Sequence, residues 1–325
     1  MDDRFVVLLE YFESKHEDRK QEIVKSIEMN CGVPQVKRVI IFIDPEVEFP
    51  PSLKRVLSKE NYDKIELHHT EPGGRSTYAD FFSYANEHLV GENCILCNND
   101  ISFDETLDHI RLAEDFDLEG HFICLTRWDS KKDGGFELMP LLIKKNGLPN
   151  ESTRARSHDS WIFKSPLPAK MLERGKFCTG IPGCDNMICY LAVVSGLKVF
   201  NPSELVVSRH THLSGRRTYS DENRIGYEEE YAGVYPTGHI HYDIGRILYR
   251  RIVNRKSMEC TYWSGEEAIK KILDADSIRE VSERYYDAIH QDLLEQGYST
   301  GLNVNQGVLH SSFSDFKSDL IRMLL

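Results

Sequence analysis

The first third of the chain alternates between short apolar runs and amphipathic segments. Residues 4–9 are almost wholly apolar, and residues 39–43 form a second run of the same kind. Runs of this length without polar alternation are typical of strands buried on both faces of a parallel sheet. Between them, Ile23, Val24 and Ile27 recur on one face of a predicted helix. We therefore expect the chain to begin with a strand, a helix and a second strand.

The same alternation continues further along the chain. Residues 64–68 predict a weaker third strand, and Thr77 caps a helix whose large apolar residues recur at helical spacing. Residues 94–97 predict a fourth strand, and residues 121–126 predict another. The order strand, helix, strand, short helix, strand, helix, strand predicts an α/β fold with a doubly wound, mostly parallel sheet.

The pattern changes after about residue 218. Tyrosine and charged residues dominate as far as residue 262, and residues 266–296 then show the spacing of a long amphipathic helix. Residues 313–325 predict a final helix. We therefore divide the chain into an α/β domain, residues 1–218, and a mainly helical C-terminal region, residues 219–325, which carries no motif with a chemical interpretation.

Composition narrows the classes of protein. The chain has 325 residues, of which 40% are hydrophobic and 28% are charged, as expected for a soluble globular protein with a real core. A net charge of −12 argues against a nucleic-acid partner, which would require a basic surface. We expect no membrane span, because no apolar run approaches about 20 residues. The acidic N-terminus leads directly into a strand without a signal peptide, so we expect a cytoplasmic protein.

Eight cysteines in a chain without a signal sequence are expected to be reduced and mostly buried. Cys94 and Cys97 have the spacing of a metal knuckle. However, residues three apart on a strand point to opposite faces, and no second pair at zinc spacing follows. We therefore interpret the cysteines as core residues.

A polar segment, Asn98-Asn99-Asp100, follows the fourth strand directly. The carboxyl edge of an open α/β sheet is where ligands bind, and amide and carboxylate oxygens suit Mg²⁺ or Mn²⁺. Asn and Asp are also ordinary turn residues, so the segment taken alone fits a simple turn better than a ligand site. Its position in the predicted sheet favours a ligand site.

Two of the three other polar clusters contain carboxylates at the ends of predicted elements. Asp159 follows His158 just before a short strand, and Asp185 stands at the start of a helix after a glycine- and proline-rich loop. Either carboxylate could act as a general base. Asp185 could equally be an N-cap, and the helix dipole would lower its pKa, which disfavours it as a base. For Asp159, the pattern favours a turn residue or a surface hydrogen-bond partner over a catalytic role.

The third cluster contains two histidines, His210 and His212. Residues two apart on an extended segment face the same way, so both rings could reach one metal ion or diphosphate. The alternative is an ordinary pair of histidines on an edge strand. Arg216 and Arg217 follow closely and could clamp a phosphate, although such pairs are more often solvated.

The glycine motifs of common nucleotide-binding folds are missing from the sequence. No G-x-G-x-x-G follows the first strand, and G-x-x-x-x-G-K-[ST] does not occur. Dinucleotide-binding and P-loop folds therefore lose most of their support. A phosphate bound by this sheet would have to be neutralised by a metal or by basic side chains. Arg75 is a candidate, because it precedes the helix that leads to the fourth strand.

Together these motifs resemble the GT-A type nucleotide-sugar glycosyltransferases over residues 4–213. The resemblance is carried by residues 98–100 in the place of that family's D-x-D motif, by residues 75–81, and by residues 182–186. It implies a GT-A (Rossmann-like) fold. It also implies transfer of a sugar from a nucleotide-diphosphate sugar donor to a hydroxyl of a glycan or other acceptor, with inversion and with help from Mn²⁺ or Mg²⁺.

The resemblance also implies roles for individual residues. Asp100 is the expected metal ligand, supported by His210 and His212, and Asp185 is the expected general base, with Asp159 as the second candidate. The residues expected to contact the donor are Arg75, Asn98, Asn99 and Arg216. Asn98 departs from the family pattern, because an Asp is expected there. We expect this change to weaken metal affinity and to make strict metal dependence doubtful.

Two other functions stay open at this stage. A sugar-phosphate nucleotidyltransferase would need a glycine-rich, basic phosphate loop after the first strand, where this chain has Glu10-Tyr-Phe-Glu13. A catalytically weak carbohydrate- or nucleotide-binding module could retain the fold without transfer, and Asn98 keeps that alternative open.

Overall fold

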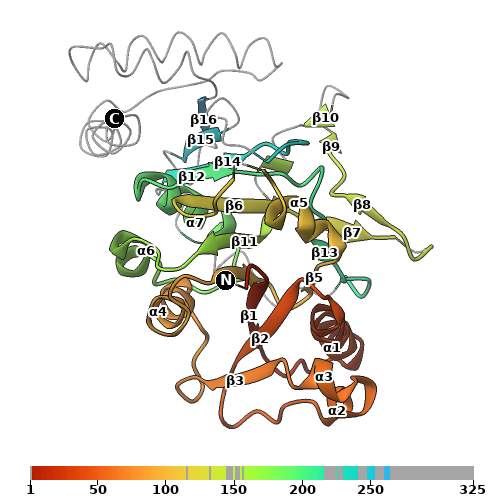
Figure 1. Cartoon of the computed structure of the whole chain (residues 1–325). Coiled ribbons are helices and arrows are strands. Elements are labelled where there is room, and N and C mark those ends of the chain that lie inside the picture. The colour runs from red at the N-terminus through yellow and green to blue at the C-terminus, as the bar shows by residue number, and fades with distance from the viewer. Residues whose placement is uncertain are drawn as a thin grey trace, which may run out of the picture.

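The computed structural model describes residues 2–114, 116–131, 133–143, 149–150, 154–155, 157–215, 225, 230–240, 247–252 and 260–263. Its centre is a seven-stranded sheet (Figure 1). From one edge to the other, its strands are β12 (Lys198–Phe200), β6 (His121–Thr126), β11 (His158–Lys164), β4 (Asn93–Cys97), β1 (Phe5–Tyr11), β2 (Val36–Ile43) and β3 (Ile65–His69).

The part of the sheet built from β1 to β4 is parallel, as predicted. β1 lies between β2 and β4, and Phe5 pairs with Val36 on one side and with Asn93 on the other. All β1 residues except Glu10 are buried, which explains the unbroken apolar run in the sequence. The predicted order of strands and helices up to β4 is confirmed.

The other half of the sheet is mixed, so the sheet as a whole is mostly parallel, as predicted, with one antiparallel strand that the sequence did not predict. β11 is antiparallel to both of its neighbours, β4 and β6. In its described residues, the chain from β6 to β11 passes through β7 (Trp128–Ser130), β8 (Phe136–Leu138), β9 (Leu142–Ile143) and β10 (Pro149–Asn150) and contains no crossover α-helix. Without such a crossover, a returning strand runs antiparallel. The amino end of β11 therefore lies beside the carboxyl end of β4, where Ser160 pairs with Cys97.

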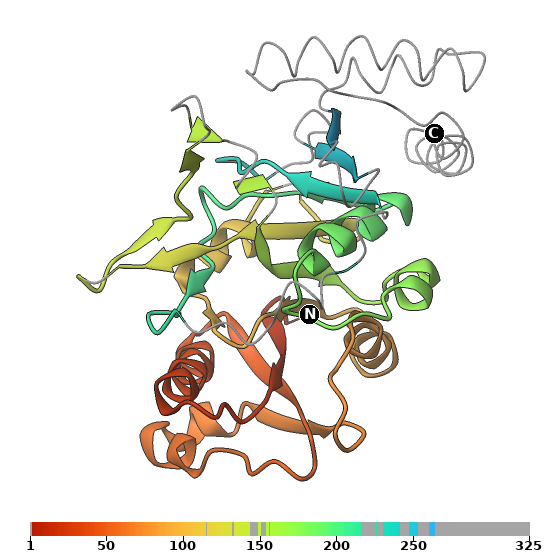
Figure 2. The same ribbon diagram turned by 180° about the vertical axis from the view of Figure 1, so that it is seen from behind.

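Helices cover both faces of the sheet (Figures 1 and 2). One face packs against α1 (Glu17–Gly32), and the other packs against α4 (Tyr78–His88), α6 (Ala169–Arg174) and α7 (Cys184–Val194). The remaining helices are α2 (Pro51–Val56), α3 (Lys59–Tyr62), the 3₁₀ turn η1 (Glu105–Leu107) and α5 (Asp108–Arg111). Cys94 and Cys97 are free and buried in the cores on opposite faces, as the strand spacing predicts.

A second, four-stranded sheet positions the segment after β12. Its order is β5 (Ile101–Ser102), β13 (Arg209–His210), β7 and β8. β13 is antiparallel to β5 and parallel to β7. The segment that bears the two histidines is therefore held beside the continuation of β4.

The described residues after residue 218 include strands and no helix. β14 (Glu230–Val234), β15 (Ile247–Ile252) and β16 (Cys260–Trp263) form an antiparallel sheet, and β14 packs on α7. The helices predicted at residues 266–296 and 313–325 lie outside the described residues, and the division at residue 218 stays a prediction. No helix in the described part of the chain has the length and apolar character needed to cross a membrane.

Candidate functional site

A polar cavity opens at the edge where the carboxyl ends of β1, β4 and β6 meet the amino end of β11. Residues from these four strand ends line it together with Arg19 of α1, the segment before α4, the loop before α7 and the histidine segment. The lining residues are Glu10, Phe12, Arg19, Arg75, Cys97, Asn98, Asn99, Asp100, Arg127, Asp159, Thr179, Gly180, His210 and His212.

Backbone pairing brings the histidine segment to Asp100. His210 pairs with Ile101 of β5 on one side and with Asp129 of β7 on the other. The backbone N–H of Thr211 donates to the Asp100 carbonyl at 2.9 Å. Residues more than 100 positions apart in the sequence are thus fixed by sheet hydrogen bonds, which makes the cluster rigid.

The Asp100 carboxylate is the centre of the cluster. Its Oδ2 atom lies 2.6 Å from Arg19 Nη2, 3.2 Å from His210 Nε2 and 3.6 Å from His212 Nδ1. Burial alone would raise the pKa of Asp100. The hydrogen bond and charge of His210, together with Arg19, outweigh burial and hold the Asp100 pKa well below its usual range.

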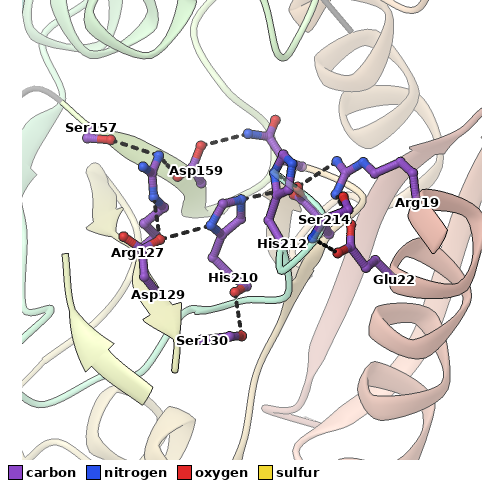
Figure 3. Close-up of polar contacts among 12 residues, drawn as sticks. Arg19, Glu22, Arg127, Asp129, Ser130, Ser157, Asp159, His210, His212 and Ser214 are labelled. Atoms are coloured by element: carbon purple, nitrogen blue, oxygen red, sulfur yellow. Dashed lines mark hydrogen bonds and ion pairs between the residues drawn. The ribbon is translucent and has the colours of Figure 1, made fainter. Parts of the chain in front are cut away.

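His210 is oriented by a second carboxylate on its far side. His210 Nδ1 lies 2.9 Å from Asp129 Oδ1, and Arg127 Nε donates to the same Asp129 oxygen at 2.8 Å (Figure 3). Burial lowers the pKa of His210, but Asp100 and Asp129 more than offset burial and raise it to about 9. The two carboxylates therefore favour the protonated form of His210.

Asp100, His210 and His212 fit a divalent cation. One oxygen or nitrogen ligand atom from each lies within 4.8 Å of the others. The contact of His210 Nδ1 with Asp129 leaves Nε2 facing Asp100, which is the arrangement usual for a metal-ligating histidine. Nε2 of His212 is buried without a hydrogen-bond partner among the described residues. One carboxylate and two imidazoles are a ligand set for a divalent transition metal, with coordination positions left open for other ligands.

Asp159 is held by two partners and does not point freely into the cavity. The Asn98 side-chain amide donates to its Oδ1 at 2.8 Å, and Arg127 Nη1 donates to its Oδ2 at 3.1 Å. The two residues also share a backbone hydrogen bond, from Asn98 N–H to the Asp159 carbonyl at 3.0 Å. The predicted general-base alternative is thus already an ion-paired carboxylate.

Asp185 occupies the first turn of α7 and, unlike Asp159, is not among the residues that line the cavity. Gly183 is the N-cap with a φ of 91°, in the left-handed region that favours glycine, so Asp185 is not the N-cap. Its Oδ2 accepts a hydrogen bond of 3.4 Å from the His158 backbone N–H. Burial and the charge of Asp159 raise the pKa of Asp185 to about 7. The predicted lowering by the helix dipole is therefore wrong, because these two effects are larger.

The donor-contact candidates have different surroundings. Arg75 lines the cavity, where it donates to Glu10 Oε2 at 2.8 Å and to the Thr179 carbonyl at 3.0 Å. Asn99 is buried and also lines the cavity. Arg216 and Arg217 lie outside the described residues. The roles proposed for all of these side chains stay predictions.

The sequence did not identify four charged residues of the cavity and its surroundings: Glu10, Arg19, Arg127 and Asp129. Three of them stand at strand ends or just beyond, and Arg127 and Asp129 flank Trp128 immediately after β6. A position at or just beyond the end of a strand could have identified Glu10, Arg127 and Asp129 as site residues. Arg19 carries no such signal, because it lies within a charged helix and only the packing of α1 directs it to Asp100.

No protein-family model matches the sequence, and no curated protein matches it. Among solved structures, the chain is similar to mannosyltransferase PcManGT from Pyrobaculum calidifontis, solved with GDP-Man and Mn²⁺, with a TM-score of 0.38 and 14% identity. The match covers 64% of this chain and 56% of that enzyme, so the chain spans little more than half of its length.

Two other similar structures are a 4-diphosphocytidyl-2C-methyl-D-erythritol synthase and a synthase of the same name from Anaerococcus prevotii. The first has a TM-score of 0.35 and 10% identity, covering 68% of this chain and 94% of that one. The second has a TM-score of 0.36 and 13% identity, covering 69% and 95%. All three likenesses concern the fold, at low sequence identity.

Proposed function

We propose that the chain is a glycosyltransferase that moves a sugar from a nucleotide-diphosphate sugar to an acceptor hydroxyl, with inversion and with help from a divalent metal. One observation carries the proposal. A carboxylate–histidine cluster that suits a metal lies in the same cavity as Asp159, and burial together with the charge of Asp159 raises the pKa of Asp185, in the first turn of α7, to about 7. Sugar transfer from a diphosphate needs both parts.

One side of the cavity carries the residues that would stabilise the charge of the leaving diphosphate. Asp100, His210 and His212 would hold Mn²⁺ or Mg²⁺, which when bound supplies positive charge to the leaving diphosphate. Arg75 and Arg127 add fixed positive charge at the same wall, and each is already oriented by a carboxylate. Preorganised charge of this kind stabilises a leaving group without reorganisation during the reaction.

Asp185 suits the task of a general base. A carboxyl group with a pKa of about 7 is partly ionised at neutral pH and is a stronger proton acceptor than an ordinary aspartate. Asp159, by contrast, is neutralised by Arg127 and bonded to Asn98. We therefore assign proton removal from the acceptor hydroxyl to Asp185, and we assign to Asp159 the role of raising the pKa of Asp185.

Two features of the cavity disfavour the sugar-phosphate nucleotidyltransferase. That activity needs a basic phosphate loop after β1, but near the end of β1 the cavity holds the carboxylate of Glu10, which accepts hydrogen bonds from Arg75 and from the Ser76 backbone. Phe12, the next cavity residue, is uncharged. The binding-module alternative differs from a transferase only in turnover, so an activity measurement separates them.

A panel of nucleotide sugars tests the proposal. The full chain is incubated with each donor and Mn²⁺, and both thermal stabilisation and released nucleotide products are measured. The transferase releases nucleoside diphosphate from the donor that stabilises it. Stabilisation without release would support a binding module, and pyrophosphate-dependent nucleotide exchange would support a nucleotidyltransferase.

A further inference from the structure

We propose that Arg19 is a resident cation that competes with the divalent metal for the Asp100 carboxylate and thereby sets the metal affinity of the site. The inference rests on the proposed function only in taking Asp100 as the metal ligand. Arg19 is then a positioning residue for the metal, and no motif in the sequence singles it out.

The competition follows from which oxygen atom Arg19 occupies. Arg19 Nη2 lies 2.6 Å from Asp100 Oδ2, and this is the oxygen that faces both His210 and His212. A metal held by the carboxylate and the two imidazoles needs this oxygen. A guanidinium group and a metal ion cannot both approach it closely, because both are cations and both require its lone pairs.

Burial strengthens the competition. The side chains of Arg19 and Asp100 are 8% and 6% exposed, so water screens little of the repulsion between the guanidinium and an incoming cation. A metal ion that enters without an anionic partner therefore meets a carboxylate that is already paired with a cation, the Arg19 guanidinium.

Arg19 has a second partner that can retain it when Asp100 is taken by metal. Its Nη1 donates to Glu22 Oε2 at 3.2 Å, one helical turn along α1. Glu22 is itself fixed by Ser214, whose backbone N–H donates to it at 2.7 Å and whose hydroxyl donates at 3.0 Å (Figure 3). Ser214 follows His212 by two residues, so the same contacts hold the histidine segment in place. Arg19 can thus release Asp100 without becoming an unpaired buried charge.

The test is a titration of the full chain with Mn²⁺ alone. Binding is measured by calorimetry or from the electron paramagnetic resonance signal of free Mn²⁺. Arg19→Gln removes the competing cation, and we expect its Mn²⁺ affinity to rise about tenfold or more. Lys25→Gln is the matched control, because it removes one positive charge from an exposed position on the same helix. We expect the control to bind Mn²⁺ as the wild type does.

A charge-balanced double variant is the control for unfolding of the Arg19→Gln variant. Arg19→Gln combined with Glu22→Gln removes both members of the buried pair, and we expect the same rise in affinity. Unchanged or weaker Mn²⁺ binding in these variants, or no Mn²⁺ binding in any of the proteins, would overturn the competition. The titration contains no nucleotide, so its failure is distinct from failure to release nucleoside diphosphate in the donor panel, which bears on the transferase itself.

Discussion

Asn98 donates its side-chain amide to the carboxylate of Asp159 at 2.8 Å, and a backbone hydrogen bond of 3.0 Å joins the same two residues. This contact explains why the chain departs from the D-x-D pattern that it resembles. An aspartate at position 98 would face a second carboxylate across the β4–β11 pairing, whereas an amide can donate. The contact with Asp159 of β11 therefore favours an amide over a carboxylate at position 98.

The first prediction concerns Asn98→Asp. The substitution replaces a hydrogen bond by a repulsion between two carboxylates, so we expect a loss of ~1–3 kcal/mol in the free energy of unfolding. We expect no gain in Mn²⁺ affinity, although the change restores the D-x-D pattern. Thermal or denaturant unfolding and a Mn²⁺ titration measure the two effects.

The control for this variant is Asn93→Asp at the other end of β4, where the amide donates only to a backbone carbonyl, that of Asp3. We expect this control to lose less stability. If Asn98→Asp were as stable as wild type and bound Mn²⁺ more tightly, Asn98 would be a weakened metal ligand and not a partner of Asp159.

Asp185→Asn tests the assignment of the general base. We expect donor affinity to be kept and turnover to fall by ~10²-fold or more, because an amide cannot accept the acceptor's proton. Steady-state kinetics with the donor found in the panel measure both quantities. Asp117→Asn is a suitable control, since Asp117 pairs with Lys164 at the opposite end of β11. Full turnover in Asp185→Asn would remove Asp185 from the reaction.

Asp159→Asn distinguishes the two candidate bases by the pH dependence of turnover. The charge of Asp159 contributes to the raised pKa of Asp185, so its removal lowers that pKa. We expect the acidic limb of the pH–rate profile to move from about 7 toward lower pH, with substantial activity kept. A collapse of turnover at every pH would instead make Asp159 the base.

The raised pKa of Asp185 also determines how the free energy of unfolding should depend on pH. Its folded-state pKa of about 7 exceeds the unfolded value of 3.8, so between these values the folded protein binds more protons than the unfolded chain. Stability therefore falls as pH rises through this window, and the cost is complete above pH 7. Asp185→Asn removes the cost. We expect the variant to gain on the order of 2 kcal/mol over wild type at pH 8 and little at pH 4.

Denaturant unfolding across this pH range checks that prediction. Parallel stability curves for the wild type and Asp185→Asn would show that the carboxyl has an ordinary pKa. In that case Asp185 would also lose its main qualification as a general base.

Local patterns in the sequence were sufficient to predict the parallel half of the sheet. Apolar runs such as residues 39–43 are set by burial on both faces, and such burial is visible without any partner. The antiparallel direction of β11 was not predictable in this way. The direction depends on the connection through short strands. The residues of β11, Ser160 among them, would show the same pattern of apolar and polar positions in a parallel or an antiparallel strand.

The residues of the site also divide into those that local sequence patterns predicted and those that only tertiary packing determines. Asp100, His210 and His212 could be singled out because each follows or lies on a recognisable extended segment, although only the pairing of β13 with β5 and β7 shows that they meet. Arg19 was not predictable, because its position is set by how α1 packs. The pKa of Asp185 was predicted in the wrong direction, since burial and Asp159 are tertiary effects that outweigh the helix dipole.

Release of nucleoside diphosphate by wild type and Asp100→Ala, each with Mn²⁺ and with a chelator, tests the central claim most directly. The account predicts Mn²⁺-dependent release by the wild type, and a loss of ~10²-fold or more both with the chelator and in Asp100→Ala. Undiminished release by Asp100→Ala in the presence of Mn²⁺ would contradict it.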